Sequence, residues 1–210
     1  MIDDDILFST EVGSWMWGMN LPESDHDIIN VYAQSTRDIL SGHEHIRNKP
    51  NKKKMIGGME YDFQYMEIGH LIGLLIKGNV NAIWAVTSPI VHRGSDTMCQ
   101  LREITINNLS KASYPSIHGM AISNLHDNEK RPNMRPNKAY KQCLRTLKFG
   151  INIFKNGIVK YEPVMHEVTK TEIDNAFIEL KNVFSTTTLI NSPDEYIYRN
   201  FLYDLRVSGL

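Results

Sequence analysis

The arrangement of apolar and polar positions near the N-terminus predicts three β-strands. Residues 6–12 are rich in strand formers and end at a Gly-Ser pair, which is a turn signal. Residues 27–34 are mostly apolar, which is typical of a strand in the middle of a sheet. Residues 59–68 form a third candidate strand, in which acidic and aromatic residues alternate. Residues 41–58 are polar, basic and interrupted by Gly and Pro, so we expect a loop there.

The spacing of apolar residues becomes helical after the third strand. The run that follows it ends at Gly78, a typical residue just beyond a helix C-terminus. Ser95 and the sequence Ser-Pro-Asp-Glu from Ser192 are helix start signals. Further helices are expected over 95–110, 112–127, 137–157, 171–184 and 192–209, with a short extended segment at 157–164. We therefore predict an α+β fold, with a small three-stranded core in residues 1–90 and a mostly helical region, 91–210, packed on it.

The composition argues against a membrane-spanning protein and against a protein that binds nucleic acid through its overall charge. A formal net charge of -1 gives no overall attraction to nucleic acid or membrane, and no apolar run reaches the roughly 18 residues of a membrane span. The acidic N-terminus is unlike a targeting signal, and the two cysteines lack the spacing of a metal site, so we expect a cytoplasmic protein. Charge is nevertheless unevenly distributed. Residues 130–160 contain nine Lys or Arg and no acid, whereas residues 1–30 are acidic, a pattern that suits a site for cations and polyanions together.

Two acidic residues at the start of the second strand form the first half of a candidate site. Residues i and i+2 of a strand face the same way, so Asp25 and Asp27 should project together. On the third strand Asp62 shares a face with Glu60, and Asp62 joins the other two carboxylates if the strands are neighbours. Three clustered carboxylates repel one another unless divalent cations lie between them. Oxygen ligands of this kind suit Mg²⁺ or Mn²⁺, and Mg²⁺ commonly binds substrate phosphates as well.

The Gly-Ser pair, Gly13 and Ser14, is the second half of the candidate site. Glycine allows close approach of the backbone, and the turn offers free N–H groups and a hydroxyl to a phosphate. Phosphate binding beside a cluster of carboxylates predicts phosphoryl or nucleotidyl transfer. The alternative that the pair is only a tight turn stays open.

The spacing of these residues resembles the signature of the DNA polymerase β-like nucleotidyltransferases. The chain is most similar to a bacterial and phage branch of predicted nucleotidyltransferases linked to an RNA repair pathway. The matching positions are Gly13, Ser14, Gly18, Ser24, Asp25, Asp27, Val31, the segment 78–81, Lys138, Arg145, Leu147, Pro193 and Asp194. The chain departs from the pattern at Trp17, Asn30, Val80, Trp84 and Gln142.

The resemblance implies a mixed sheet of the nucleotidyltransferase fold and the roles of several residues. Asp25, Asp27 and Asp62 would bind the metal ions and carry the catalysis, with Asp62 helping to deprotonate the acceptor hydroxyl. The donor would be an NTP, expected to be ATP, and pyrophosphate would leave. The nucleotide would be bound by Gly13, Ser14, Ser24, Lys138 and Arg145.

A basic stripe on the predicted helix at 137–157 bears on the identity of the acceptor. Its cations share an arc of roughly 100° on the helical wheel; they are Lys138, Lys141, Arg145, Lys148 and Lys155. Lys141, Lys148 and Lys155 are candidate contacts for an RNA or other phosphate backbone, and a solvated surface is the alternative. The acceptor could be an RNA or tRNA end, a protein side chain as in antitoxin-like adenylyltransferases, or a small molecule. A non-catalytic module that binds nucleotide or RNA is the other class of function considered.

Overall fold

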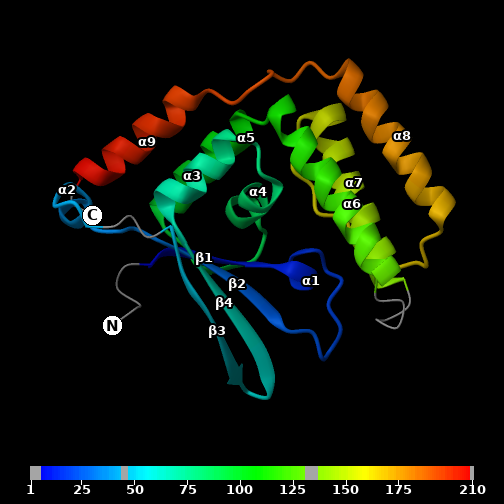
Figure 1. The fold of residues 1–210 in the computed structure, drawn as a ribbon, viewed down its shortest axis with the longest axis horizontal. Helices are drawn as coiled ribbons and strands as arrows, with labels where there is room; N and C mark the ends of the chain where they lie inside the picture. Colours follow the sequence, from blue (N-terminus) through cyan, green and yellow to red (C-terminus); the bar gives the residue numbers. More distant parts are fainter. Residues whose placement is uncertain (1–5, 44–46, 131–136, 209–210) are drawn as a thin grey trace.

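The computed structural model describes residues 6–43, 47–130 and 137–208, with backbone alone for 127–130. Arg131 and Arg135 of the basic segment lie outside the described residues, as do Asp3–Asp5 of the acidic one. Figure 1 shows an N-terminal sheet followed by a helical C-terminal half, which confirms the predicted α+β fold.

The sheet is mixed and has five strands within the described part of the chain. Their order is β3-β4-β2-β1-β5. The central pair, β2 and β4, is parallel, and the other pairs are antiparallel. The strands are β1 (Ile6–Val12), β2 (His26–Tyr32), β3 (Asn48–Ile56), β4 (Met59–Glu67) and β5 (Val91–Arg93).

The structure corrects two sequence predictions about this sheet. The expected loop at 41–58 is wrong over half of its length, because β3 is a strand there and pairs with β4. Lysine-rich β3 has no apolar alternation, but it is an edge strand, where charged side chains can remain in water. The three-stranded core is also an underestimate, since both β3 and the short edge strand β5 were missed.

The predicted helices are present, most with shifts of a few residues at their ends. Ser95 caps α5 by accepting a hydrogen bond from the Met98 N–H, and Asp194 caps α9 by accepting one from Tyr196. The segment 157–164 is irregular rather than a strand. The helices are α1 (Gly13–Met16), α2 (Thr36–Leu40), α3 (Ile68–Ile76), α4 (Val80–Thr87), α5 (Asp96–Asn107), α6 (Tyr114–Lys130), α7 (Lys138–Asn156), α8 (Lys170–Thr186) and α9 (Glu195–Val207), with a 3₁₀ turn at Lys111–Ser113.

One hydrophobic core joins the sheet to the helices. Phe8, Ile29 and Val31 contribute to it from one face of the sheet. Helix α7 packs against both α6 and α8 and places most of its apolar residues in the same core. The division at residue 90 stays a prediction, and β5, which pairs with β1, lies just beyond it. None of the helices within the described ranges is both long and apolar enough to cross a membrane.

Helix α9 is attached to the sheet by a buried ion pair. Glu67, at the end of β4, is fully buried, and Arg206 of α9 donates to its carboxylate and to the backbone carbonyl of Gln34. Glu67 also accepts hydrogen bonds from the Gly69 and His70 N–H groups and so caps α3. The start of α3, the end of β4 and the last helix are therefore held together at one carboxylate.

Candidate active site

The parallel pairing of β2 and β4 brings the predicted carboxylates together. Asp27 lies directly opposite Asp62 in the register, and Asp25 immediately precedes β2. Burial raises the pKa of Asp27 above its ordinary value, and the negative charges of Asp25, Asp62 and Glu11 raise it further. The charged form of Asp27 is therefore penalised by its surroundings, as expected for clustered carboxylates.

The donor set at this point suits a cation that also binds phosphate. Asp62 Oδ1 is buried and has no hydrogen-bond partner among the described residues, so it is available to a ligand. No group of three His, Cys, Asp or Glu side chains in the described part of the chain lies close enough to hold a metal alone. Mg²⁺ usually binds through one or two carboxylates, with water and substrate phosphate completing its shell. Asp27 and Asp62, with Asp25 beside them, fit that arrangement.

Gly13 lies against the Asp27 carboxylate. The Gly-Ser pair begins the one-turn helix α1, and Gly13 has a φ of 66°, which favours glycine. A Cβ at this position would be 2.1 Å from Asp27 Oδ2. Both the backbone conformation and the contact therefore favour glycine. Binding of phosphate by Gly13 and Ser14 stays a prediction.

The loop between α1 and β2 is held by two further contacts. The Ser24 hydroxyl oxygen accepts a hydrogen bond from the Leu21 N–H at 2.8 Å, so this predicted nucleotide contact also closes a turn. The Trp15 indole donates to the Asp25 carbonyl at 3.1 Å and so helps to position that residue. Trp17 is instead a core residue, 2% exposed, with its ring edge-on to Trp84.

Helix α7 places two predicted cations near Asp27. The charge of Lys138 acts to lower the pKa of Asp27, against the effects of burial and the neighbouring acids. Arg145 is buried, and burial lowers its pKa to about 10 although the Asp27 carboxylate opposes that shift. Its guanidinium lies 5.1 Å from the Trp17 ring, and its Nε is buried with no hydrogen-bond partner among the described residues. The structure therefore brings Lys138 and Arg145 to the carboxylates.

The remaining cations of the basic stripe are directed elsewhere. Lys141 donates to the Met165 carbonyl at 2.9 Å, and Lys155 forms an exposed ion pair with Glu179 of α8 at 3.8 Å. Since Arg145 is buried, the five cations do not share one open surface. RNA or phosphate contacts by Lys141, Lys148 and Lys155 stay predictions.

Lys53, which the sequence placed in a solvated loop, lies on a strand beside the carboxylates. It lies on β3 directly opposite Asp62, and its ammonium donates to Glu60 Oε1 at 2.5 Å. The hydrogen bond and the charge of Glu60 raise the pKa of Lys53, with smaller contributions from Asp62 and Asp25. Successive side chains of a strand point to opposite faces, so Lys53 faces away from Lys52 and Lys54. The sequence would have indicated this placement if β3 had been recognised as a strand.

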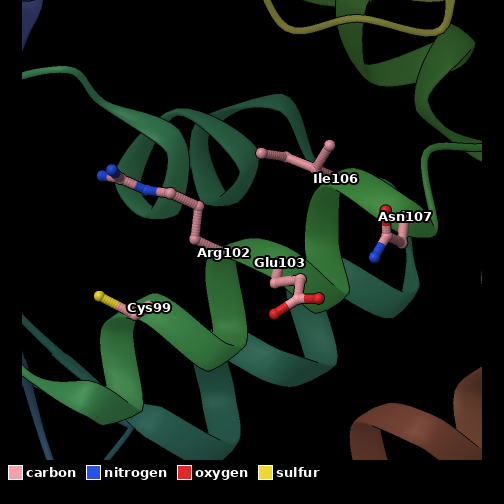
Figure 2. A pocket seen from close by; sticks show the side chains of 5 residues that line it. All are labelled: Cys99, Arg102, Glu103, Ile106 and Asn107. Carbon is pink, nitrogen blue, oxygen red and sulfur yellow. The ribbon is translucent and has the colours of Figure 1, made fainter.

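The structure also has a mostly apolar cavity of about 290 Å³ on α5 (Figure 2). It is lined by Cys99, Arg102, Glu103, Ile106 and Asn107. The Arg102 side chain donates to the Val86 and Ser88 carbonyls, which fixes α5 to the end of α4. None of these residues belongs to the predicted site.

Comparison with known proteins identifies a family. The sequence model of the RNA repair pathway DNA polymerase beta family (RlaP) matches residues 3–192. Among solved structures, the chain is similar to a nucleotidyltransferase-like protein from Exiguobacterium sibiricum 255-15. The identity is 11%, the match covers 98% of this chain and 75% of that one, and the TM-score is 0.37. No curated protein matches the chain.

Proposed function

Because the chain belongs to the RNA repair pathway DNA polymerase beta family, we propose that it is a metal-dependent nucleotidyltransferase. It transfers NMP from an NTP, with ATP as the expected donor, to a hydroxyl acceptor and releases pyrophosphate. The observation that carries the proposal is the pairing of Asp27 with Asp62 across parallel strands, beside Lys138 and Arg145. Carboxylates and cations around one point suit a Mg²⁺-bound triphosphate.

The reaction is an in-line displacement at the α-phosphorus. The acceptor oxygen forms a bond to the α-phosphorus while the bond to the oxygen that bridges to the β-phosphate breaks, and pyrophosphate leaves with that electron pair. Asp62, whose Oδ1 is buried without a partner among the described residues, takes the proton of the acceptor hydroxyl. Mg²⁺ or Mn²⁺ bound by Asp25, Asp27 and Asp62 would stabilise the charge on the phosphate oxygens.

The cationic residues bind the donor triphosphate. Arg145 is held by burial and by its position over Trp17, so its guanidinium is fixed before the nucleotide arrives. Lys138 is exposed at the start of α7, where its ammonium can reach the terminal phosphates. Gly13 permits the chain to pass close to Asp27, and Ser14 offers a hydroxyl at the same place.

An RNA end is the acceptor that we propose, with tRNA as one case of it. The test incubates the purified protein with α-labelled ATP, Mg²⁺ and an RNA oligonucleotide that ends in a 3′-hydroxyl. We expect the label on the RNA, an equal amount of pyrophosphate, and neither product with a 3′-phosphate oligonucleotide or with Asp27→Asn.

The other outcomes are informative. Label on protein would replace RNA with a protein side chain as the acceptor, as in antitoxin-like adenylyltransferases. NTP binding in titration calorimetry without pyrophosphate release on any acceptor would overturn the enzyme and indicate a non-catalytic nucleotide-binding module.

A further inference from the structure

The face of the sheet opposite the carboxylates carries a row of stacked rings. His26 of β2 and Tyr61 of β4 are register partners, and their rings stack at 4.3 Å with an interplanar angle of 12°. Trp15 of α1 stacks on the other side of His26 at 4.4 Å and 14°. Phe63, two residues along β4, continues the row from Tyr61 at 5.9 Å and 16°. Of the four, Trp15, Tyr61 and Phe63 are partly exposed.

Lysines of the edge strand β3 lie along this row. Lys54 is paired with Tyr61 and Lys52 with Phe63, so their side chains project on the same face as the rings. The Lys54 ammonium is 5.8 Å from the centre of the Phe63 ring. Neither lysine forms an ion pair with another described residue. Among the described elements β3 packs extensively only on β4.

The exposed charge of this face is positive within the described residues. Its two acids, Glu11 and Glu67, are buried and already bound. Glu11 lies between two histidines, with Oε1 2.6 Å from His26 Nδ1 and Oε2 2.8 Å from His92 Nε2. Glu67 pairs with Arg206. An anionic ligand on this face therefore meets cations without opposing exposed carboxylates.

We propose that this surface binds a single-stranded nucleic acid, the acceptor strand of the reaction. We call it the ring platform: Trp15, His26, Tyr61, Phe63, Lys52 and Lys54. The inference rests on the proposed function, whose acceptor class it specifies. Trp15 and Phe63, at the two ends of the row, each keep a ring face that no neighbour in the row covers. These faces can stack on unpaired bases of any sequence, and the lysines beside the row attract the phosphates. A protein partner with a purely apolar surface would not be attracted by the charge of these lysines.

The position of the ring platform relative to the carboxylates supports this assignment. Trp15 directly follows Ser14, and its indole donates to the carbonyl of Asp25, so the row of rings begins beside the acids. His26 lies between Asp25 and Asp27 in the sequence and faces the other way. A strand that stacks on the platform can therefore pass around this end of the sheet and present its terminal hydroxyl to Asp62.

The test measures binding of a fluorescein-labelled 12-nucleotide RNA by anisotropy, in EDTA and without NTP. Lys52→Gln/Lys54→Gln is compared with a matched double variant of the exposed lysines of α8, Lys170→Gln/Lys181→Gln. Each phosphate contact to a single strand contributes about 0.7 to the slope of log affinity against log salt. We expect the platform variant to flatten the slope by about 1.4 and the α8 variant to leave it unchanged. Equal slopes and affinities for the two variants would overturn the platform.

A second variant tests stacking. Phe63→Leu removes the ring but keeps an apolar side chain, and Phe177→Leu on α8 is the matched control, since Phe177 is also a half-buried ring. Stacking on one base is worth about 1–3 kcal/mol, so Phe63→Leu should weaken RNA binding by about fivefold or more. An unlabelled RNA duplex should compete poorly, because its bases are already stacked. A duplex that competes better than the single strand would also overturn the platform.

The two proposals fail in different ways. Asp27→Asn should abolish transfer and leave anisotropy unchanged. Wild-type protein that binds the oligonucleotide through these residues but transfers nothing would overturn the enzyme and keep the platform. Protein that extends RNA equally well with and without Lys52, Lys54 and Phe63 would overturn the platform and keep the enzyme. A DNA oligonucleotide of the same length, measured in parallel, decides which sugar the platform prefers.

Discussion

Replacement of Gly13 by alanine should damage the site more than the fold. The new Cβ would be 2.1 Å from Asp27 Oδ2, whereas real Cβ contacts are essentially never shorter than 3.0 Å. The carboxylate must therefore retreat by roughly 1 Å, and a displacement of that size can reduce the rate of an enzyme by about 100-fold. The backbone also resists, because a left-handed conformation costs a non-glycine residue about 1–2 kcal/mol.

Gly18→Ala is a control that separates the effect of the contact with Asp27 from the effect of the left-handed backbone conformation. Gly18 has a φ of 62°, close to that of Gly13, but no atom lies within 4 Å of the position that a Cβ would take there. Both variants should lose about 1–2 kcal/mol of stability. For a chain of this size that corresponds to a fall in Tm of about 2–8 °C in calorimetry.

Transfer activity should distinguish the two variants where Tm does not. We expect kcat/KM for nucleotide transfer to fall about 100-fold in Gly13→Ala relative to Gly18→Ala. If both variants kept the same activity, the contact between Gly13 and the Asp27 carboxylate would have no catalytic consequence. Glycine would then be needed at this position for the backbone turn alone.

Other contacts give three further predictions. Asp27→Asn and Asp62→Asn should each abolish pyrophosphate release while Tm holds or rises, because burial and neighbouring acids penalise the charge on Asp27; retained activity would exclude these residues as catalytic groups. Lys138→Ala should raise the KM for NTP equally with every acceptor, and a change confined to the RNA acceptor would mean that Lys138 binds RNA instead. Arg206→Ala should destabilise the protein by about 3–5 kcal/mol in urea unfolding, because it removes the cation that is bound to a buried carboxylate. Arg199→Ala, which removes an exposed pair on the same helix, should cost less than about 1 kcal/mol, and equal losses would show that burial of the pair is unimportant.

The positions of the candidate carboxylates were more predictable than the sheet around them. Alternation within two short segments was enough to place Asp27 and Asp62 on one face, and the parallel register of β2 and β4 put them side by side. The start of α5 at Ser95 and the start of α9 within Ser-Pro-Asp-Glu, where Asp194 is the cap, could also be predicted, because side-chain caps are local in sequence.

Strand β3 could not be predicted from the sequence, and the reason is physical. Its lysines are stabilised as strand residues by partners from elsewhere in the chain, such as the Tyr32 ring, whose centre is 3.9 Å from the Lys49 ammonium. No local pattern contains that contact. The same limit applies to the basic stripe, since a helical wheel cannot show that Arg145 is buried or that Lys155 faces Glu179 on another helix.

The ion pair between Glu67 and Arg206 means that the region of family similarity and the unit that folds are not the same. The family match ends at residue 192, and α9 begins at Glu195. A protein shortened to the matched region would lose the only described cation paired with a fully buried carboxylate. That carboxylate ends the strand on which Asp62 lies. Trimming at a boundary drawn from similarity alone would therefore weaken β4, the strand of Asp62, from its far end.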